Sequence, residues 1–169
     1  MYERILVAID GSGQSCKALD HAAAIAEKLG SELTLLTVVP RVTLPILPNA
    51  GFSAVTMTSA KNMIHEQEKM RDVYQDVLAD AEARVRSEHP DLNVSTTLRE
   101  GRPSATIVGV AEKEGYDLIV MGSRGIRGIT GWIMGSTSRR VVDSCKKPVR
   151  MCLAPLKKRP DFVLFSYRK

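Results

Sequence analysis

The sequence contains no apolar run close to the roughly 20 residues that a membrane-spanning helix needs. It also lacks the charged start and long apolar stretch of a secretory signal, because the apolar run after Arg4 already ends at Asp10. We therefore expect a cytoplasmic protein without a membrane segment. With 169 residues, 44% of them hydrophobic, the chain is long enough for one globular domain with a single core.

Cysteines are few and poorly spaced for a shared site. Cys16, Cys145 and Cys152 are odd in number and form no C-x-x-C pair, which argues against a disulfide framework or a zinc site. We expect them to be reduced, half-buried thiols. The three histidines are dispersed as well, and no Ser/His/Asp or Cys/His set for nucleophilic catalysis suggests itself.

Basic residues exceed acidic ones, but the excess is confined to the C-terminal end. The formal net charge is +5, and residues 155–169 hold five basic residues against one acidic residue, so this segment accounts for +4 of it. A surface that binds nucleic acid needs basic charge spread over the fold with aromatic residues between. Aromatic residues make up only 5% of the chain. We therefore do not expect nucleic acid to be a partner of the domain.

Apolar runs typical of buried strands alternate with amphipathic patterns typical of helices. Strands are expected at 4–10, 32–40, 93–100, 116–122 and 149–153. Helices are expected at 15–30, 70–88, 104–115 and 136–144, and residues 41–58 have the composition of a long loop. This alternation predicts a single doubly wound, Rossmann-like α/β domain with helices on both faces of a five-stranded parallel sheet of order 3-2-1-4-5.

In such a sheet, ligands bind beyond the carboxyl ends of the strands, at the point where the winding reverses direction. The first and fourth strands are neighbours there. Their ends read AIDGS and VMGSRG. Asp10 and the glycine-rich segment after the fourth strand should therefore face one pocket.

The glycine-rich segment at 122–138, GSRGIRGITGWIMGSTS, is the most informative stretch of the chain. A Walker pattern is absent because no Gly-Lys-Ser/Thr occurs, and GSGQSC at 11–16 matches a dinucleotide fingerprint only in part. What remains is Gly122-x₂-Gly125-x₉-Gly135-Ser136. Glycines allow close approach of the backbone and positive φ, and a helix beginning at Ser136 offers unpaired N–H groups. We interpret the segment as a phosphate cradle; a purely structural set of turns is the alternative.

This spacing resembles a known family when it is taken with ILVAIDGS near the start, LTLLTVV in the second strand, DLIVMG in the fourth and Gly101-x-Pro103. These motifs are similar, in order and spacing, to those of the universal stress proteins, UspA-like, and specifically to their ATP-binding branch. The resemblance runs from Tyr2 to Leu153, so we expect a nucleotide-binding domain at 1–154 and an extension at 155–169. It implies a homodimer formed through the last strand.

The resemblance also implies a set of binding residues. Asp10 would contact the ribose of ATP, and the backbone near Ala8 and Val38 would border the adenine. The phosphates, with the Mg²⁺ or Mn²⁺ that they hold, would be bound by Gly122, Ser123, Arg124, Gly125, Gly135, Ser136 and Thr137.

The chain departs from that family in three places. Thr37 stands where many members have histidine, Arg150 replaces an aliphatic residue of the last strand, and the extension has no usual counterpart. The end of the extension, DFVLFSYRK at 161–169, is rich in large apolar residues that are costly to leave in water. We predict that it adds a strand or crosses to a partner subunit and strengthens the dimer, with 157–160 as the turn. A disordered tail is the alternative.

These observations predict a nucleotide-dependent regulatory protein of the stress response that acts through its dimer or a protein partner. We do not expect it to be primarily an enzyme, because no general base or water-positioning residue is evident beside the phosphates. A slow ATP hydrolase or phosphotransferase built on the same pocket is the first alternative. An interaction adaptor that binds no nucleotide is the second.

Overall fold

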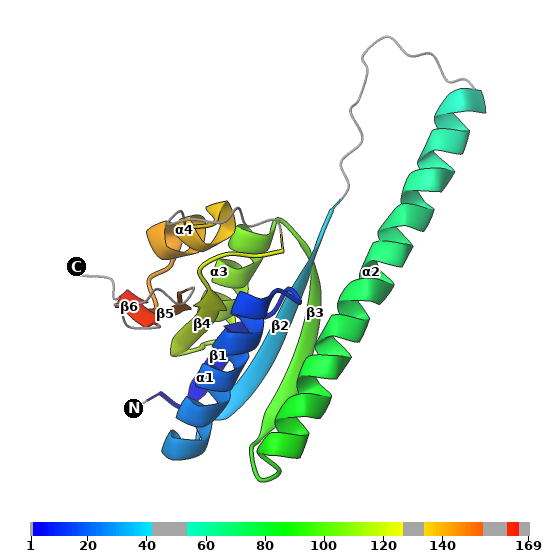
Figure 1. Cartoon of the computed structure of the whole chain (residues 1–169). Coiled ribbons are helices and arrows are strands. Elements are labelled where there is room, and N and C mark those ends of the chain that lie inside the picture. The colour runs from blue at the N-terminus through cyan, green and yellow to red at the C-terminus, as the bar shows by residue number, and fades with distance from the viewer. Residues whose placement is uncertain (1, 42–53, 127–133, 154–161, 166–169) are drawn as a thin grey trace.

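The alternating apolar and amphipathic segments form one mixed sheet with helices packed on both of its faces (Figure 1). The computed structural model describes residues 2–41, 54–126, 134–153 and 162–165, excluding the side chains of 54–61. Within them the strands are β1 (Arg4–Ala8), β2 (Glu32–Pro40), β3 (Val94–Gly101), β4 (Leu118–Gly122), β5 (Val149–Cys152) and β6 (Phe162–Phe165). The helices are α1 (Gly13–Leu29), α2 (Ala54–Glu88), α3 (Pro103–Lys113) and α4 (Ser136–Ser144).

The strand order is β3-β2-β1-β4-β5-β6. The first five strands are parallel, which confirms the predicted order, and β6 extends the sheet as an antiparallel edge strand. β1 lies between β2 and β4, with Val7 opposite both Leu35 and Val120. The winding therefore reverses at β1, and the carboxyl ends of β1 and β4 are adjacent.

Both faces of the sheet are covered, which explains why β1 and β4 are almost continuously apolar. α1 and α2 cover one face, where Leu19 and Leu78 pack with Val7 of β1. α3 and α4 cover the other face, where Ile107 and Val141 pack in one cluster with other strand residues. Ser12 caps the start of α1 by accepting the N–H of Ser15, and Gly30 ends the helix at φ 65°, as its position predicts.

The second helix is longer than the sequence pattern suggests. α2 begins at Ala54, inside the expected loop of 41–58, because no proline or glycine follows Gly51 until the helix ends. Residues 42–53, which hold the rest of that loop, lie outside the described residues. The C-terminal half of α2 buries Leu78 and Val85 against the sheet, whereas its N-terminal half extends beyond the sheet (Figure 1). In the part of the chain that the structure describes, no helix has the length and apolar character to cross a membrane.

The C-terminal extension supplies the sixth strand. β6 pairs with β5 of the same chain, with Leu164 opposite Arg150 and Phe162 opposite Cys152. The Arg150 guanidinium carbon lies 3.8 Å from the centre of the Phe162 ring, and Phe165 packs against the α3–α4 side of the core. Two of the sequence departures, Arg150 and the extension, therefore contact each other. The predicted turn at 157–160 lies outside the described residues.

The three cysteines, all of them described, form no disulfide. Cys16 is half-buried as expected, but Cys145 and Cys152 are buried, so the expectation of half-buried thiols is wrong for these two. Cys145 lies at the end of α4 and Cys152 lies in β5, and each packs within one of the two clusters of buried core residues. Burial raises the pKa of the Cys145 thiol, which keeps it protonated and unreactive.

Candidate functional site

A cavity of about 550 Å³ lies beyond the carboxyl ends of β1, β2 and β4, where the winding of the sheet reverses. Each of the three strands contributes to its lining, with Ala8 from β1, Val38 from β2 and Met121 from β4. Residues of α2, α3 and α4 form its walls. Asp10 and the described ends of the glycine segment therefore face one pocket, as the sheet order predicted.

The two halves of this cavity differ in chemistry. One half is apolar and is lined by Leu36, Val38, Pro40, Met70, Tyr74, Pro103 and Ile107. The other half carries hydroxyl, carboxylate and backbone groups and is lined by Asp10, Ser15, Arg124, Gly125, Gly135, Ser136 and Thr137. Such a cavity fits a ligand with one apolar end and one polar end that accepts many hydrogen bonds.

Asp10 joins the loops that follow β1 and β4. Its Oδ1 accepts the N–H of Ser12 at 3.0 Å, and its Oδ2 accepts the N–H of Ile126 at 3.3 Å. Ser12 Oγ in turn donates to the carbonyl of Arg124 at 3.4 Å. These bonds fix the carboxylate at the cavity wall. Each carboxylate oxygen keeps a further lone pair, so Asp10 can still accept a hydrogen bond from a ligand hydroxyl.

The two described ends of the glycine segment are bonded to each other. Gly135 donates its N–H to the carbonyl of Ser123 at 2.8 Å, and Ser138 Oγ donates to the carbonyl of Gly122 at 2.9 Å. Residues 127–133, including Gly128 and Gly131, lie outside the described residues. These bonds place the start of α4 beside the end of β4, at the cavity.

The amino end of α4 is the strongest anion-binding feature of the polar half. Gly135 is its N-cap, and Ser136 and Thr137 form its first turn at the cavity wall. The first N–H groups of a helix have no partner within the helix and carry a partial positive charge. Together with two hydroxyl groups they suit the oxygens of a phosphate. The third hydroxyl, of Ser138, is buried and is used to tie α4 to β4.

The glycines are needed for close approach and not for an unusual backbone. Gly122, Gly125 and Gly135 all lack a positive φ, so that part of the sequence interpretation is wrong for these three. A Cβ at Gly125 would collide with Asp10 Oδ2, and one at Gly135 would lie 3.3 Å from the Ser123 carbonyl oxygen. Close contacts with neighbouring atoms therefore limit the room for a side chain at Gly125 and Gly135, although the backbone angles themselves are ordinary.

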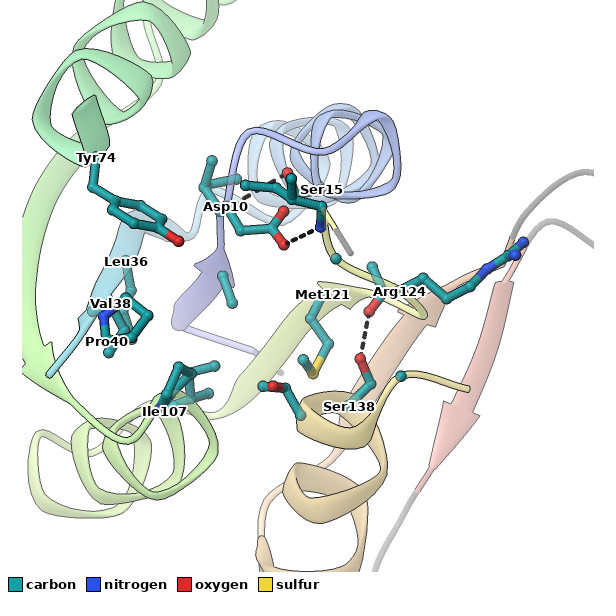
Figure 2. A pocket seen from close by; sticks show the side chains of 18 of the residues that line it. Asp10, Ser15, Leu36, Val38, Pro40, Tyr74, Ile107, Met121, Arg124 and Ser138 are labelled. Atoms are coloured by element: carbon teal, nitrogen blue, oxygen red, sulfur yellow. Dashed lines mark hydrogen bonds between the residues drawn. The ribbon is translucent and has the colours of Figure 1, made fainter. Parts of the chain in front are cut away.

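All the residues that the sequence placed in the site line the cavity except Ser123. Ser123 is only 5% exposed, and its N–H donates to the carbonyl of Cys152 at 2.9 Å, so its backbone is used to join β4 to β5. Arg124 contributes to the lining, but Figure 2 shows its guanidinium directed away from the cavity.

The sequence interpretation missed the contribution of two helices. Met70 and Tyr74 of α2 and Ile107 of α3 line the apolar half. The Gly101-x-Pro103 motif was a signal for α3, because Pro103 starts this helix at the cavity. The sequence holds no comparable signal for α2, because the part of this helix that reaches the cavity depends on how the helix packs over the sheet.

Metal-binding side chains do not cluster in the described part of the chain. No group of three or more His, Cys, Asp or Glu residues there could hold a metal ion. Asp10 is the only carboxylate among the described residues that line the cavity. A cation at this site would therefore need most of its ligands from a bound molecule or from water.

Comparison with known proteins gives a consistent result. The family model described as the universal stress protein family matches residues 1–152. Universal stress protein YxiE of Bacillus subtilis is 33% identical over 156 residues, which cover 88% of this chain and 97% of that protein. The solved structure of universal stress protein UspA from Lactobacillus plantarum shares the fold, with a TM-score of 0.72 and 24% identity over 91% of this chain and 98% of that one.

Two solved structures of similar fold contain nucleotides. A universal stress protein from Archaeoglobus fulgidus, described as a complex with dAMP, has a TM-score of 0.55 and 24% identity, covering 88% of this chain and 95% of that chain. A second universal stress protein, described as a complex with cAMP, has a TM-score of 0.61 and 22% identity. The match covers 89% of this chain and 96% of that chain.

Proposed function

Because the chain belongs to the universal stress protein family, we propose that it is a regulatory protein that binds ATP in the cavity beyond β1 and β4. The observation that carries this proposal is the polar half of the cavity. There, both ends of the glycine segment and the amino end of α4 present N–H and hydroxyl groups to one space. The apolar half beside it suits a base.

The parts of ATP can be assigned to these two halves. We propose that the adenine lies in the apolar half, bordered by Ala8 and Val38, and that Asp10 accepts a hydrogen bond from the ribose. The phosphates would lie at the amino end of α4 and the backbone of Gly122, Gly125 and Gly135. A Mg²⁺ or Mn²⁺ ion would be held mainly by the phosphates, since Asp10 is the lone carboxylate of the described lining.

Relatives support an adenine nucleotide as the class of ligand. The two structures described with a nucleotide hold dAMP and cAMP, which share the adenine base and a phosphate. We favour ATP over a monophosphate because the polar half presents several N–H and hydroxyl groups, from the described ends of the glycine segment and the first turn of α4.

A regulatory role fits the cavity better than catalysis. The described lining contains no His, Cys or Lys, and both oxygens of its only carboxylate, Asp10, accept backbone N–H groups. A general base for water attack is therefore not evident there. We propose that ATP occupancy is communicated to a partner protein or to the dimer.

Calorimetry on the purified protein tests this proposal. We expect ATP to bind, and GTP to bind about tenfold more weakly or worse, because a site shaped for adenine leaves the polar edge of guanine unpaired. Absence of ATP binding, or equal affinity for GTP, would contradict the proposal. ATP turnover well above background that Asp10→Ala abolishes would favour the hydrolase alternative instead.

We also propose that the protein is a homodimer in which β6 takes part. Within the described residues β6 pairs on one side only, with β5, so its outer edge can accept another strand. Phe162 and Leu164, on one face of this strand, are 40% and 52% exposed. Antiparallel pairing of two β6 strands would cover part of this apolar surface.

Truncation after Leu156 is expected to lower the melting temperature by about 5–10 °C and to shift the protein toward monomer. It removes the β5–β6 ladder and the contact of Arg150 with Phe162, and it exposes the edge of β5. Light scattering and thermal unfolding measure both effects. Truncation after Phe165, which keeps β6, is the control. A dimer of unchanged melting temperature after the longer deletion would show that β6 has no such role.

A further inference from the structure

α2 forms one wall of the apolar half of the cavity, and the helix is held on both sides of this wall. Gln67 Nε2 donates to the carbonyl of Pro40 at 3.3 Å, at the end of β2. Three turns further along α2, Val77 packs against Gly11 in the loop after β1. A Cβ added at Gly11 would lie 3.2 Å from Cγ2 of Val77. Met70 and Tyr74 lie between these two contacts on the same face of the helix and line the cavity.

Tyr74 is the only aromatic residue among the described residues that line the cavity. Its ring is half-buried and extends from α2 over the strand ends, above Leu36 and Val38, with Ile107 of α3 on the opposite wall (Figure 2). Ile107 and Pro103 are four residues apart and so lie on one face of α3. The apolar half therefore has an aromatic ring on its α2 side and aliphatic side chains on its α3 side.

We infer that Tyr74 is the base-stacking residue of this site, and that a bound purine base thereby holds the Met70–Val77 part of α2 against the sheet. The inference rests on the proposed function and adds to it the residue that recognises the base and the helix that reports occupancy. A flat heteroaromatic ring is the ligand group that gains most from a pocket with one aromatic wall. No residue of α2 is among the described residues that line the polar half, which comes from the loops after β1 and β4 and from α1 and α4.

Titration of the wild type and of Tyr74→Ala with adenosine, ATP and inorganic tripolyphosphate tests this inference by calorimetry. We expect Tyr74→Ala to bind adenosine and ATP about tenfold more weakly than the wild type, and tripolyphosphate equally well. Tyr74→Phe keeps the ring and should stay within about twofold of the wild type for all three ligands. Val73→Ala, at a neighbouring position that is 62% exposed, is the matched control on α2 and should change none of them.

Hydrogen exchange on the wild type supplies a second measurement that does not depend on the folding of any variant. We expect adenosine and ATP, but not tripolyphosphate, to slow amide exchange in residues 70–77 of α2.

The outcomes separate this inference from the proposed function. If the wild type binds ATP but Tyr74→Ala binds adenosine and ATP as well as the wild type does, the inference is wrong and ATP binding stands. Equal weakening of tripolyphosphate would show a general structural effect and would also overturn it, as would the absence of adenosine-dependent protection in α2. A wild type that binds neither adenosine nor ATP would overturn both.

Discussion

Replacement of Gly135 by valine is expected to weaken ATP binding about a hundredfold or more while the protein stays folded. The backbone angles of Gly135, φ −61° and ψ 150°, are ones that valine adopts readily. Its Cβ would lie 3.3 Å from the Ser123 carbonyl oxygen, a tight contact that small shifts can relieve. The branched side chain, however, would occupy space beside the first turn of α4, where N–H and hydroxyl groups line the polar half of the cavity.

Calorimetry with ATP and thermal unfolding of the same sample measure the two parts of this prediction. Gly13→Val is the matched control, because Gly13 also starts a helix and a Cβ there meets nothing within 4 Å. The control should bind ATP like the wild type. A folded Gly135→Val variant with unchanged ATP affinity would show that the phosphates do not lie at the amino end of α4.

Replacement of Gly122 by alanine is expected to act on stability, lowering the free energy of unfolding by about 1–3 kcal/mol and the melting temperature by about 3–10 °C. A Cβ at Gly122 would lie 2.8 Å from Gln14 Cβ and 2.9 Å from the Gln14 carbonyl carbon. These atoms belong to the first turn of α1 and cannot rotate away. Relief of the contact requires α1 to move from the end of β4.

Urea unfolding of Gly122→Ala measures this effect. Gly109→Ala in α3 is the control, since a Cβ there meets nothing within 4 Å and alanine favours the helix by about 0.5–1 kcal/mol. The control should therefore be at least as stable as the wild type. If Gly122→Ala unfolds at the same urea concentration as the wild type, the packing of α1 does not require a glycine at this position.

The two glycines illustrate how little a motif says about the role of each member. Gly122 and Gly135 belong to one spacing pattern, and the resemblance assigns both to the phosphates. In the structure, Gly122 allows the first turn of α1 to pack closely against the end of β4. Gly135 is the N-cap of α4 and leaves the space beside its first turn free of a side chain. Both line the cavity, but a Cβ at Gly122 would overlap the Gln14 backbone and require α1 to move, whereas a Cβ at Gly135 needs only small shifts.

Most of the fold could be predicted because each signal for it is local. Buried parallel strands require continuous apolar runs, and the crossovers between them require amphipathic helices, so both leave a pattern within about ten residues. Even the edge strand β6 could be anticipated, because Phe162 and its neighbours are costly to expose. The start of α2 was missed because a polar segment without proline or glycine carries no clear boundary.

The alternation of strands and helices, with the order common to such sheets, was enough to predict the strand order, the edge of the sheet that carries the site, and the position of Asp10 beside the glycine segment. Only the tertiary structure decided that Tyr74 lines the cavity, that Ser123 lies behind it and that β6 pairs within its own chain. The physical reason is the same in each case. These contacts join segments far apart in the chain, and their existence depends on packing and strand pairing across the fold, which no local periodicity encodes.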